Sequence, residues 1–320
     1  MRQLKLVPVV GLCLLISVTG CSGAGVTEPT DDHPAVLDLL RESRVLIQWQ
    51  GEIQVSDPQP WEPEAVVRGD VPAGEQLHPQ WSPDGRSIAF ALDDADGTRD
   101  LWIVDVASGT ARALVDCTDP CVWTDEPSFS PDGTEVAYIQ GDAAENGDGI
   151  GTVRSVPVAG GEPLVLFTAD PTEYPFSVAW DPAGQRLAVE VDRFASAGVH
   201  EERMTGSAIA ILTREGSVSY LTDMADGFSY PAWSPDGISI LMSAPGDLWT
   251  MPSSGGEPTR WTRLQDDGGR ALQGSYSADG AVIVFVVEEP VGSTPTVAVM
   301  SAEGGEHVTL GPGTHPRLRP

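Results

Sequence analysis

Six residues at equivalent positions of an internal repeat carry the side chains best suited to chemistry. Each stands three positions before an aromatic residue or its Leu counterpart, and the six are His78, Glu126, Ser177, Tyr230, Gln273 and His315. Two imidazoles and a carboxylate form a donor set that can hold a metal ion with an open coordination position. The alternative for the same residues is the polar lining of a water-filled opening, and on the sequence alone we favour it.

The repeat that fixes this register is built around a turn. Its clearest copy is Trp81-Ser82-Pro83-Asp84-Gly85, in which Pro sets φ, Asp can bond its own backbone and Gly adopts positive φ. The aromatic residue recurs at positions 81, 129, 180, 233 and 276. Apolar runs bounded by further turns follow each copy, as at Ile88–Leu92 and Leu101–Asp105. Four short strands per repeat of this length are typical of a β-propeller blade.

The two ends of the repeat region predict one further blade and a closed ring. Strands are expected over Arg44–Trp49, Glu52–Ser56 and Glu64–Arg68, but nothing before them resembles the first strand of a repeat. His315–Pro320 instead copies His78–Pro83 at the other end of the chain. We therefore predict an all-β fold, a six-bladed β-propeller of four-stranded antiparallel blades closed by a C-terminal inner strand in the first blade. In such a ring the six residues would gather at one mouth of the central channel.

These motifs carry a family resemblance. The Pro-x-Trp-Ser-Pro-Asp-Gly core, followed by Ile88-Ala89-Phe90 and Leu101–Asp105, resembles the WD40-like repeats of TolB-type propellers over about residues 42 to 320. The resemblance implies the propeller fold. It is a poor guide to function, because the family includes partners of envelope complexes and non-catalytic domains beside serine peptidases.

The first residues resemble a bacterial lipoprotein signal. Arg2 and Lys5 precede a mostly apolar run that is too short to span a membrane. The run ends at Gly20-Cys21, which resembles a lipobox, so Cys21 is expected to be lipidated; an ordinary cleaved signal is the alternative. We predict a signal peptide over 1–20, a lipidated Cys and flexible tether over 21–34, and the propeller over 35–320. The protein would then lie on the extracytoplasmic side of the cell membrane, held only by its N-terminal lipid.

The charge of the chain argues against one large class of partner. Its formal net charge is −29 over 320 residues. Such a surface repels phosphate backbones, so nucleic-acid binding is not expected.

Two of the four cysteines are expected to pair. Cys13 lies in the signal and Cys21 in the lipobox, which leaves Cys117 and Cys121. Outside the cytoplasm two such residues favour a disulfide. A metal site is the alternative, although the nearby aspartates match zinc poorly.

Sequence motifs of catalysis were not found. There is no Gly-x-Ser-x-Gly nucleophile elbow, no His-Glu-x-x-His and no Gly-rich phosphate loop. We therefore predict a non-catalytic binding or scaffolding propeller without metal or cofactor, a monomer that engages an envelope protein or glycan. The alternative is an enzyme, or a small-ligand or metal-binding receptor, that uses the channel mouth.

The longest expected loops mark the predicted partner surface. Loops over 141–151 and 192–206 should lie on the face opposite the Pro-Asp-Gly turns, together with the segment around Cys117. Long loops on a rigid scaffold commonly carry function, and aromatic residues dominate binding hot spots. The candidate partner-binding residues are Trp123, Tyr174, Phe194 and His200.

Overall fold

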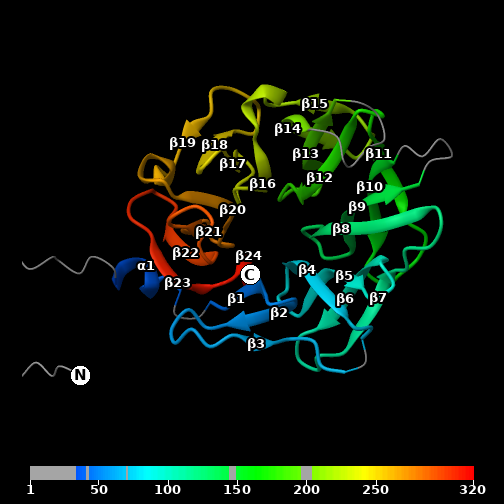
Figure 1. Ribbon diagram of the computed structural model, residues 1–320, viewed down its shortest axis with the longest axis horizontal. Coiled ribbons are helices and arrows are strands. Elements are labelled where there is room, and N and C mark those ends of the chain that lie inside the picture. The colour runs from blue at the N-terminus through cyan, green and yellow to red at the C-terminus, as the bar shows by residue number, and fades with distance from the viewer. Residues whose placement is uncertain (1–33, 41–42, 70, 144–148, 196–203) are drawn as a thin grey trace, which may run out of the picture. The chain divides into compact units, whose positions relative to one another are not determined.

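Antiparallel sheets arranged as a propeller form the computed structural model of this protein (Figure 1). The structure describes residues 34–40, 43–69, 71–143, 149–195 and 204–320, which belong to one unit, His33–Pro320. The predicted signal peptide, Cys21 and nearly all of the tether lie outside the described residues. Within the described ranges, no helix has the length and apolar character needed to cross a bilayer.

Four of the sheets have four strands and one has eight. The first sheet contains β24 (Thr314–Leu318), β1 (Val45–Trp49), β2 (Glu52–Ser56) and β3 (Glu64–Ala65). The eight-stranded sheet contains β4 (Gly74–Trp81), β5 (Ser87–Asp94), β6 (Arg99–Asp105), β7 (Ala111–Val115), β8 (Cys121–Phe129), β9 (Glu135–Asp142), β10 (Ile150–Pro157) and β11 (Leu164–Thr168). One parallel pair, Arg99 opposite Trp123, joins its two antiparallel halves β4–β7 and β8–β11.

The other three sheets each contain four consecutive strands. The third contains β12 (Glu173–Trp180), β13 (Arg186–Phe194), β14 (Met204–Thr213) and β15 (Val218–Tyr220). The fourth contains β16 (Ser229–Trp233), β17 (Ser239–Ala244), β18 (Asp247–Pro252) and β19 (Thr259–Arg260). The fifth contains β20 (Arg270–Tyr276), β21 (Val282–Glu288), β22 (Thr296–Ser301) and β23 (Val308–Pro312).

The last strand of the chain closes the ring. β24 pairs antiparallel with β1, with Leu318 opposite Val45 and Thr314 opposite Gln48. It takes the inner position in a sheet whose other strands come from the start of the described chain (Figure 1). The C-terminal inner strand expected from His315–Pro320 is therefore present. Pairing the two ends in this way removes the edge that an open ring would expose.

The repeated Ser-Pro-Asp-Gly turn is held together by its own side chains. In the copy at 82–85, the Ser82 hydroxyl donates to Asp84 Oδ1 at 2.7 Å and accepts the N–H of Ser87 at 2.9 Å. Gly85 has a φ of 65°, in the region that favours glycine. The same Ser-to-Asp bond recurs in the turns that begin at Ser130, Ser234 and Ser277. The repeated aspartates are thus explained by the turn, without a carboxylate site.

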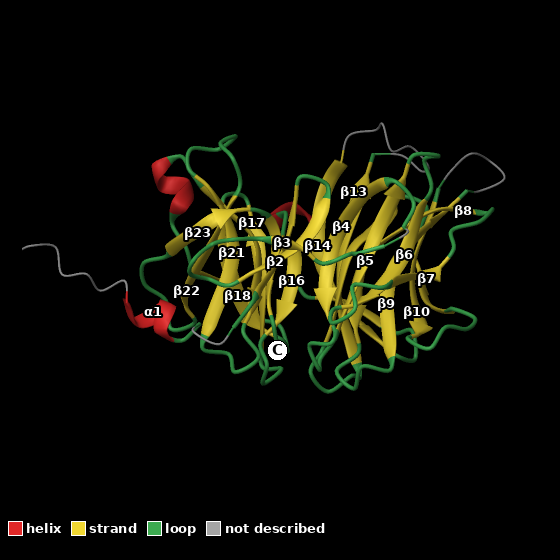
Figure 2. Ribbon diagram, turned by 90° about the horizontal axis from the view of Figure 1, so that it is seen from below, coloured by secondary structure: helices red, strands yellow, loops and turns green. Residues whose placement is uncertain are grey.

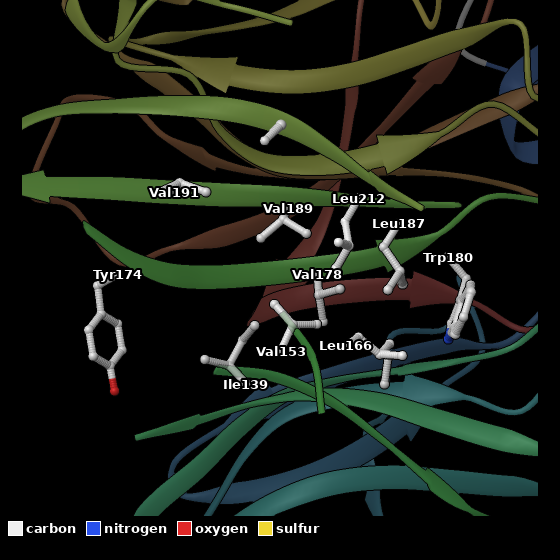
Figure 3. Packing of buried hydrophobic residues seen from close by; sticks show 12 residues of the cluster. Ile139, Val153, Leu166, Tyr174, Val178, Trp180, Leu187, Val189, Val191 and Leu212 are labelled. Atoms are coloured by element: carbon white, nitrogen blue, oxygen red, sulfur yellow. The ribbon is translucent and has the colours of Figure 1, made fainter. Parts of the chain in front are cut away.

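The apolar cores lie between neighbouring sheets and not in the centre of the ring. One cluster joins β9–β11 to β12–β14 and includes Ile139, Val153, Val178 and Val189 (Figure 3). Side chains alternate between the two faces of each strand, so every sheet packs apolar groups against both neighbouring sheets. Seen from the side, the strands run between two faces that carry the loops (Figure 2).

Some element boundaries differ from those expected. The structure also contains one short helix, α1 (Pro34–Asp38), and two 3₁₀ turns, η1 (Met224–Asp226) and η2 (Leu264–Asp267). The strand expected over 64–68 ends at Ala65, because the Arg68 N–H donates to the Gly109 carbonyl of the next sheet at 2.8 Å. β13 and β14 extend into the predicted loop 192–206 as far as the pair Phe194 and Met204.

Candidate functional site

Each inner strand is irregular at the position predicted to carry the chemistry. The pairing of β4 with β5 shifts register between Leu77 and Gln80, and all the other inner strands show a comparable shift. Five of the six residues have positive φ, between 49° and 57°, which is uncommon outside glycine. They are His78, Glu126, Tyr230, Gln273 and His315. Bulges of this kind re-aim side chains, and such backbone strain collects at functional sites.

Three of these residues converge from three inner strands. Glu126 Oε1 on β8 lies 3.5 Å from His78 Nδ1 on β4 and 4.0 Å from His315 Nε2 on β24. The two imidazole centroids are 4.4 Å apart. One ligand atom from each residue lies within 4.8 Å of the other two, which is close enough for all three to contact one cation. Two His and one Glu are a donor set of catalytic zinc sites.

A buried carboxylate holds His78 in place. Asp125 Oδ1 is hydrogen-bonded to His78 Nδ1, and Arg99 donates to Asp125 Oδ2 at 2.5 Å. Burial opposes protonation of His78, but the carboxylates of Glu126 and Asp125 outweigh it and raise the pKa of His78 to about 9. Carboxylates commonly orient metal-binding histidines in this manner. Asp125 therefore fixes the ring of one candidate ligand.

Burial opposes the charged form of the other two candidate ligands. Gln273 Nε2 donates to His315 Nε2 at 2.8 Å, so a cation at this nitrogen would have to replace the amide hydrogen. Burial, with His78 and Arg317 nearby, holds the pKa of His315 well below its usual range, which keeps the imidazole neutral. Burial likewise raises the pKa of Glu126. Its Oε1 is buried and has no hydrogen-bond partner among the described residues, a costly state that a bound cation would relieve.

The six residues at the repeat position are called the channel ring below. The half of it that lacks His78, Glu126 and His315 carries hydroxyl and amide groups. Ser177 Oγ on β12 donates to Glu190 Oε2 at 2.8 Å, and the N–H of Tyr230 on β16 donates to the same oxygen at 2.9 Å. Glu190 is a buried residue of β13. Its burial and the nearby carboxylates of Asp192 and Glu126 raise the pKa of Glu190 to about 8. In the part of the chain that is described, neither Glu190 nor Asp192 forms an ion pair.

A cavity of about 260 Å³ extends from this ring toward the Pro-Asp-Gly turns. All of the ring residues except Gln273 line it, as do Pro131 and Pro182 of the turns. Arg317 also lines it and donates from Nε to Gln80 Oε1 at 2.9 Å. The structure thus brings together the four residues expected at the channel mouth, His78, Glu126, Tyr230 and His315, and all four line this cavity.

The residues expected to anchor a partner belong largely to the core. Tyr174 is buried, and its ring centroid lies 5.4 Å from that of Trp123. Trp123 and Phe194 are partly buried against the same apolar cluster. These three described residues do not line the cavity, and His200 lies outside the described residues.

The two remaining cysteines are close together on the loop face. Cys117 and Cys121 are joined by a disulfide, with their Cα atoms 5.2 Å apart. Cys117 is buried, and its N–H donates to Asp100 Oδ1 at 2.7 Å. The bridge stabilises the segment between β7 and β8 and contributes no group to the cavity.

Sequence reasoning missed three charged groups around the ring, Asp125, Glu190 and Arg317. Asp125 precedes Glu126, but it is not at the position three residues before the aromatic residue of the repeat. Glu190 interrupts the apolar strand 187–191, and this signal could have found it, because a buried carboxyl is costly unless it has a role. Arg317 stands where the matching repeat has Gln80, so the two copies could have been compared residue by residue.

Comparison with solved structures supports the fold. No protein-family model matches the chain. TolB from Acinetobacter baumannii is similar, with a TM-score of 0.65 and 18% identity over 87% of this chain and 66% of that one. An oligogalacturonate lyase in complex with manganese has a TM-score of 0.54 and 14% identity over 84% of this chain and 73% of that one. A puromycin hydrolase has a TM-score of 0.55 and 17% identity over 82% of this chain and 42% of that one. Identities this low establish a TolB-like β-propeller fold and nothing more.

A curated protein is similar in sequence. The chain is 30% identical over 147 residues to the uncharacterized peptidase YuxL of Bacillus subtilis strain 168. The match covers 43% of this chain and 19% of the relative, so the chain spans about a fifth of that protein's length.

The prediction of a non-catalytic binding module is contradicted by this relative, which is named a peptidase. The prediction failed because it relied on motifs that lie within one short segment of the sequence. A nucleophile elbow lies within one segment, whereas the groups able to do chemistry here come from separate inner strands. The comparisons favour the alternative, in which an enzyme or a metal-binding receptor uses the central channel.

Proposed function

We propose that the protein is a metal-dependent enzyme whose catalytic site is the central channel. His78, Glu126 and His315 would hold a divalent cation, which supplies Lewis acidity toward a bound carbonyl or hydroxyl oxygen. The proposal rests on Glu126 Oε1, a buried carboxylate oxygen near two imidazoles that has no hydrogen-bond partner in the described chain. The manganese bound by the similar lyase supports a divalent cation in a propeller of this kind.

The other residues around the cavity position these ligands and the substrate. Asp125 and Arg99 fix the ring of His78, and Gln273 Oε1 accepts the backbone N–H of His315. Arg317 lines the cavity, and its guanidinium would bind an oxygen atom of the substrate. A cavity of about 260 Å³ suits a small molecule or one end of a longer chain. We infer hydrolysis as the reaction, because the curated relative is a peptidase and one similar structure is a hydrolase.

Metal binding tests the site directly. Isothermal titration with Mn²⁺ and Zn²⁺, backed by metal analysis, should show one bound cation per chain. The changes Glu126→Gln and His315→Ala should each weaken binding by about 100-fold or more, since each removes a ligand. His307→Ala is the matched control, because His307 packs against Phe285 and is not a ring residue.

Turnover tests the enzyme. The metal-loaded protein should be assayed with puromycin and oligogalacturonate, the compounds suggested by the similar proteins. Failure of the folded protein to bind either cation would contradict the metal site. Metal binding without turnover of any of these compounds would favour a receptor instead.

We further infer that the ring has six blades. The eight-stranded sheet consists of two antiparallel runs of four strands that meet through a single parallel residue pair. Two blades joined at one point would account for it, and the four other sheets complete the count. A crystal structure with six inner strands around the channel would establish the number.

We also propose that Cys21 carries a lipid and that the propeller lies outside the cytoplasm. The lipobox-like sequence supports this, and a disulfide between Cys117 and Cys121 suits an oxidising compartment. In cell fractionation, Cys21→Ser should move the protein from the membrane to the soluble fraction. Unchanged membrane retention would contradict the anchor.

A further inference from the structure

Three side chains on second strands perform the same structural task. Gln48 Oε1 accepts the N–H of His78 at 3.1 Å, Ser243 Oγ accepts that of Gln273 at 3.1 Å, and Glu190 Oε2 accepts that of Tyr230 at 2.9 Å. In each case a side chain of one sheet accepts the backbone N–H of a residue with positive φ in the next sheet. An amide and a hydroxyl are sufficient at two of the positions, so this task does not require a carboxylate at Glu190.

A carboxylate at this position is costly. Glu190 is 4% exposed, and the groups that face it are Asp192 of its own strand, Glu126 of β8 and Tyr230 of β16, none of which is a cation. Burial and these two carboxylates raise the pKa of Glu190 to about 8. A carboxyl group that titrates near neutrality can accept and return a proton during catalysis.

We propose that Ser177 is a nucleophile of the channel site and that Glu190 is its general base. Ser177 lines the cavity and already donates its hydroxyl hydrogen to Glu190 Oε2 at 2.8 Å. The inference rests on the proposed use of the channel as a catalytic site. It names the substrate class, which is a molecule with an electrophilic acyl carbon, such as an ester or an amide.

Bonds and protons balance in such a reaction. Ser177 Oγ forms a bond to the acyl carbon while its proton passes to Glu190. The bond to the leaving group breaks, and the leaving group takes the electron pair and then the proton from Glu190. Water next attacks the acyl-serine and gives its proton to Glu190. The Ser177 oxygen regains that proton as the carboxylic acid departs.

Covalent labelling with phenylmethanesulfonyl fluoride tests the pair without a known substrate. Ser177 Oγ would bond to sulfur, fluoride would leave and Glu190 would take the proton. The reaction is run on the full chain with a chelator present, because it requires no metal. Peptide mass mapping should locate the label on Ser177. The labelling rate should rise from about pH 6 to about pH 9, as Glu190 loses its proton.

Two substitutions separate the proposed chemistry from a structural role. Ser177→Ala should abolish the label. Glu190→Gln should keep the bond to the Tyr230 N–H, as Gln48 does for His78, yet slow labelling by about 100-fold and make it independent of pH. Ser243→Ala removes a structurally similar hydroxyl and should label at the parent rate.

Specific outcomes would overturn the proposal. They are a folded parent protein that is not labelled at Ser177, a flat pH profile of the parent, or a Glu190→Gln protein labelled at the parent rate. The result is independent of the metal site. Metal binding without labelling would contradict only the assignment of Ser177 as a nucleophile. Labelling without metal binding would contradict only the metal site.

Discussion

The two halves of the channel ring differ in how their buried carboxylates are balanced. On the side of His78, Asp125 contacts both an imidazole and the Arg99 guanidinium, and Glu126 lies beside His78. On the side of Glu190, neither that residue nor Asp192 forms an ion pair within the described chain. Hydrogen bonds from Ser177 and from the Tyr230 backbone take their place.

This difference separates two kinds of chemistry. Carboxylates held close to imidazoles can share one cation, which would take the place of the proton that their proximity favours on His78. A carboxyl without a cation beside it keeps its proton up to higher pH and is suited to proton transfer. The same buried cavity can then hold an electrophile on one side and activate a hydroxyl on the other.

Deleting residues 314–320 should have the largest effect on stability. It removes β24 and so disrupts both halves of the channel ring. The strand pairs with β1, and its Leu318 and His315 are buried. The loss of unfolding free energy should exceed about 5 kcal/mol, the upper range for one Leu-to-Ala change in a core. Urea titration followed by tryptophan fluorescence measures it. A truncated protein as stable as the parent would show that ring closure does not depend on β24.

Asp125→Asn should weaken cation binding by His78, Glu126 and His315 and should not affect the side of the ring that holds Ser177 and Glu190. An amide can still accept a hydrogen bond from Glu126 N–H, but it no longer balances His78 and Arg99. Mn²⁺ affinity should fall by about 10- to 100-fold, the usual effect of removing a carboxylate behind a His ligand. Ser177→Ala should leave the affinity within about twofold of the parent. Equal losses in both variants would erase the distinction between the halves.

Glu190→Gln should change the pH dependence of stability. In the folded protein the pKa of Glu190 is about 8, above its ordinary 4.5, so the folded state holds the proton more tightly. The stability that this group contributes is therefore complete below about pH 4.5 and is lost as the pH rises through about 8. Thermal melts from pH 5 to pH 8 should show a decline in the parent that is smaller in the variant. The difference should reach a few kcal/mol at most. Parallel declines in both proteins would mean that Glu190 titrates normally.

Reducing the Cys117–Cys121 disulfide should have the smallest effect and should alter neither half. So short a loop contributes about 2 kcal/mol or less in the chain-entropy account. A modest drop in melting temperature with unchanged Mn²⁺ affinity is the expected result. Loss of metal binding on reduction would reveal a coupling between the loop face and the ring that the contacts do not suggest.

Much of this arrangement could be predicted from the sequence, because the repeat fixes the register. The Ser-Pro-Asp-Gly turns located the inner strands, and counting back three residues located His78, Glu126 and His315. The same counting missed Glu190, which lies on a second strand and is linked to the ring by hydrogen bonds from Ser177 of its own sheet and from Tyr230 of the next sheet. The separate argument from loop length placed aromatic residues such as Tyr174 on a binding surface, although Tyr174 is buried. Burial and contacts between sheets depend on how the strands come together, which the local pattern does not encode.

The bulge that sets each ring residue apart from regular strand pairing has an evolutionary consequence. Backbone geometry places these side chains in the channel, while the apolar clusters lie between the sheets. A substitution at a ring position therefore leaves the cores intact. The ring behaves as a set of exchangeable positions on a constant frame, so a few point changes could equip the same propeller for a different cation or a different reaction. Stability and chemistry could then be selected separately within one lineage.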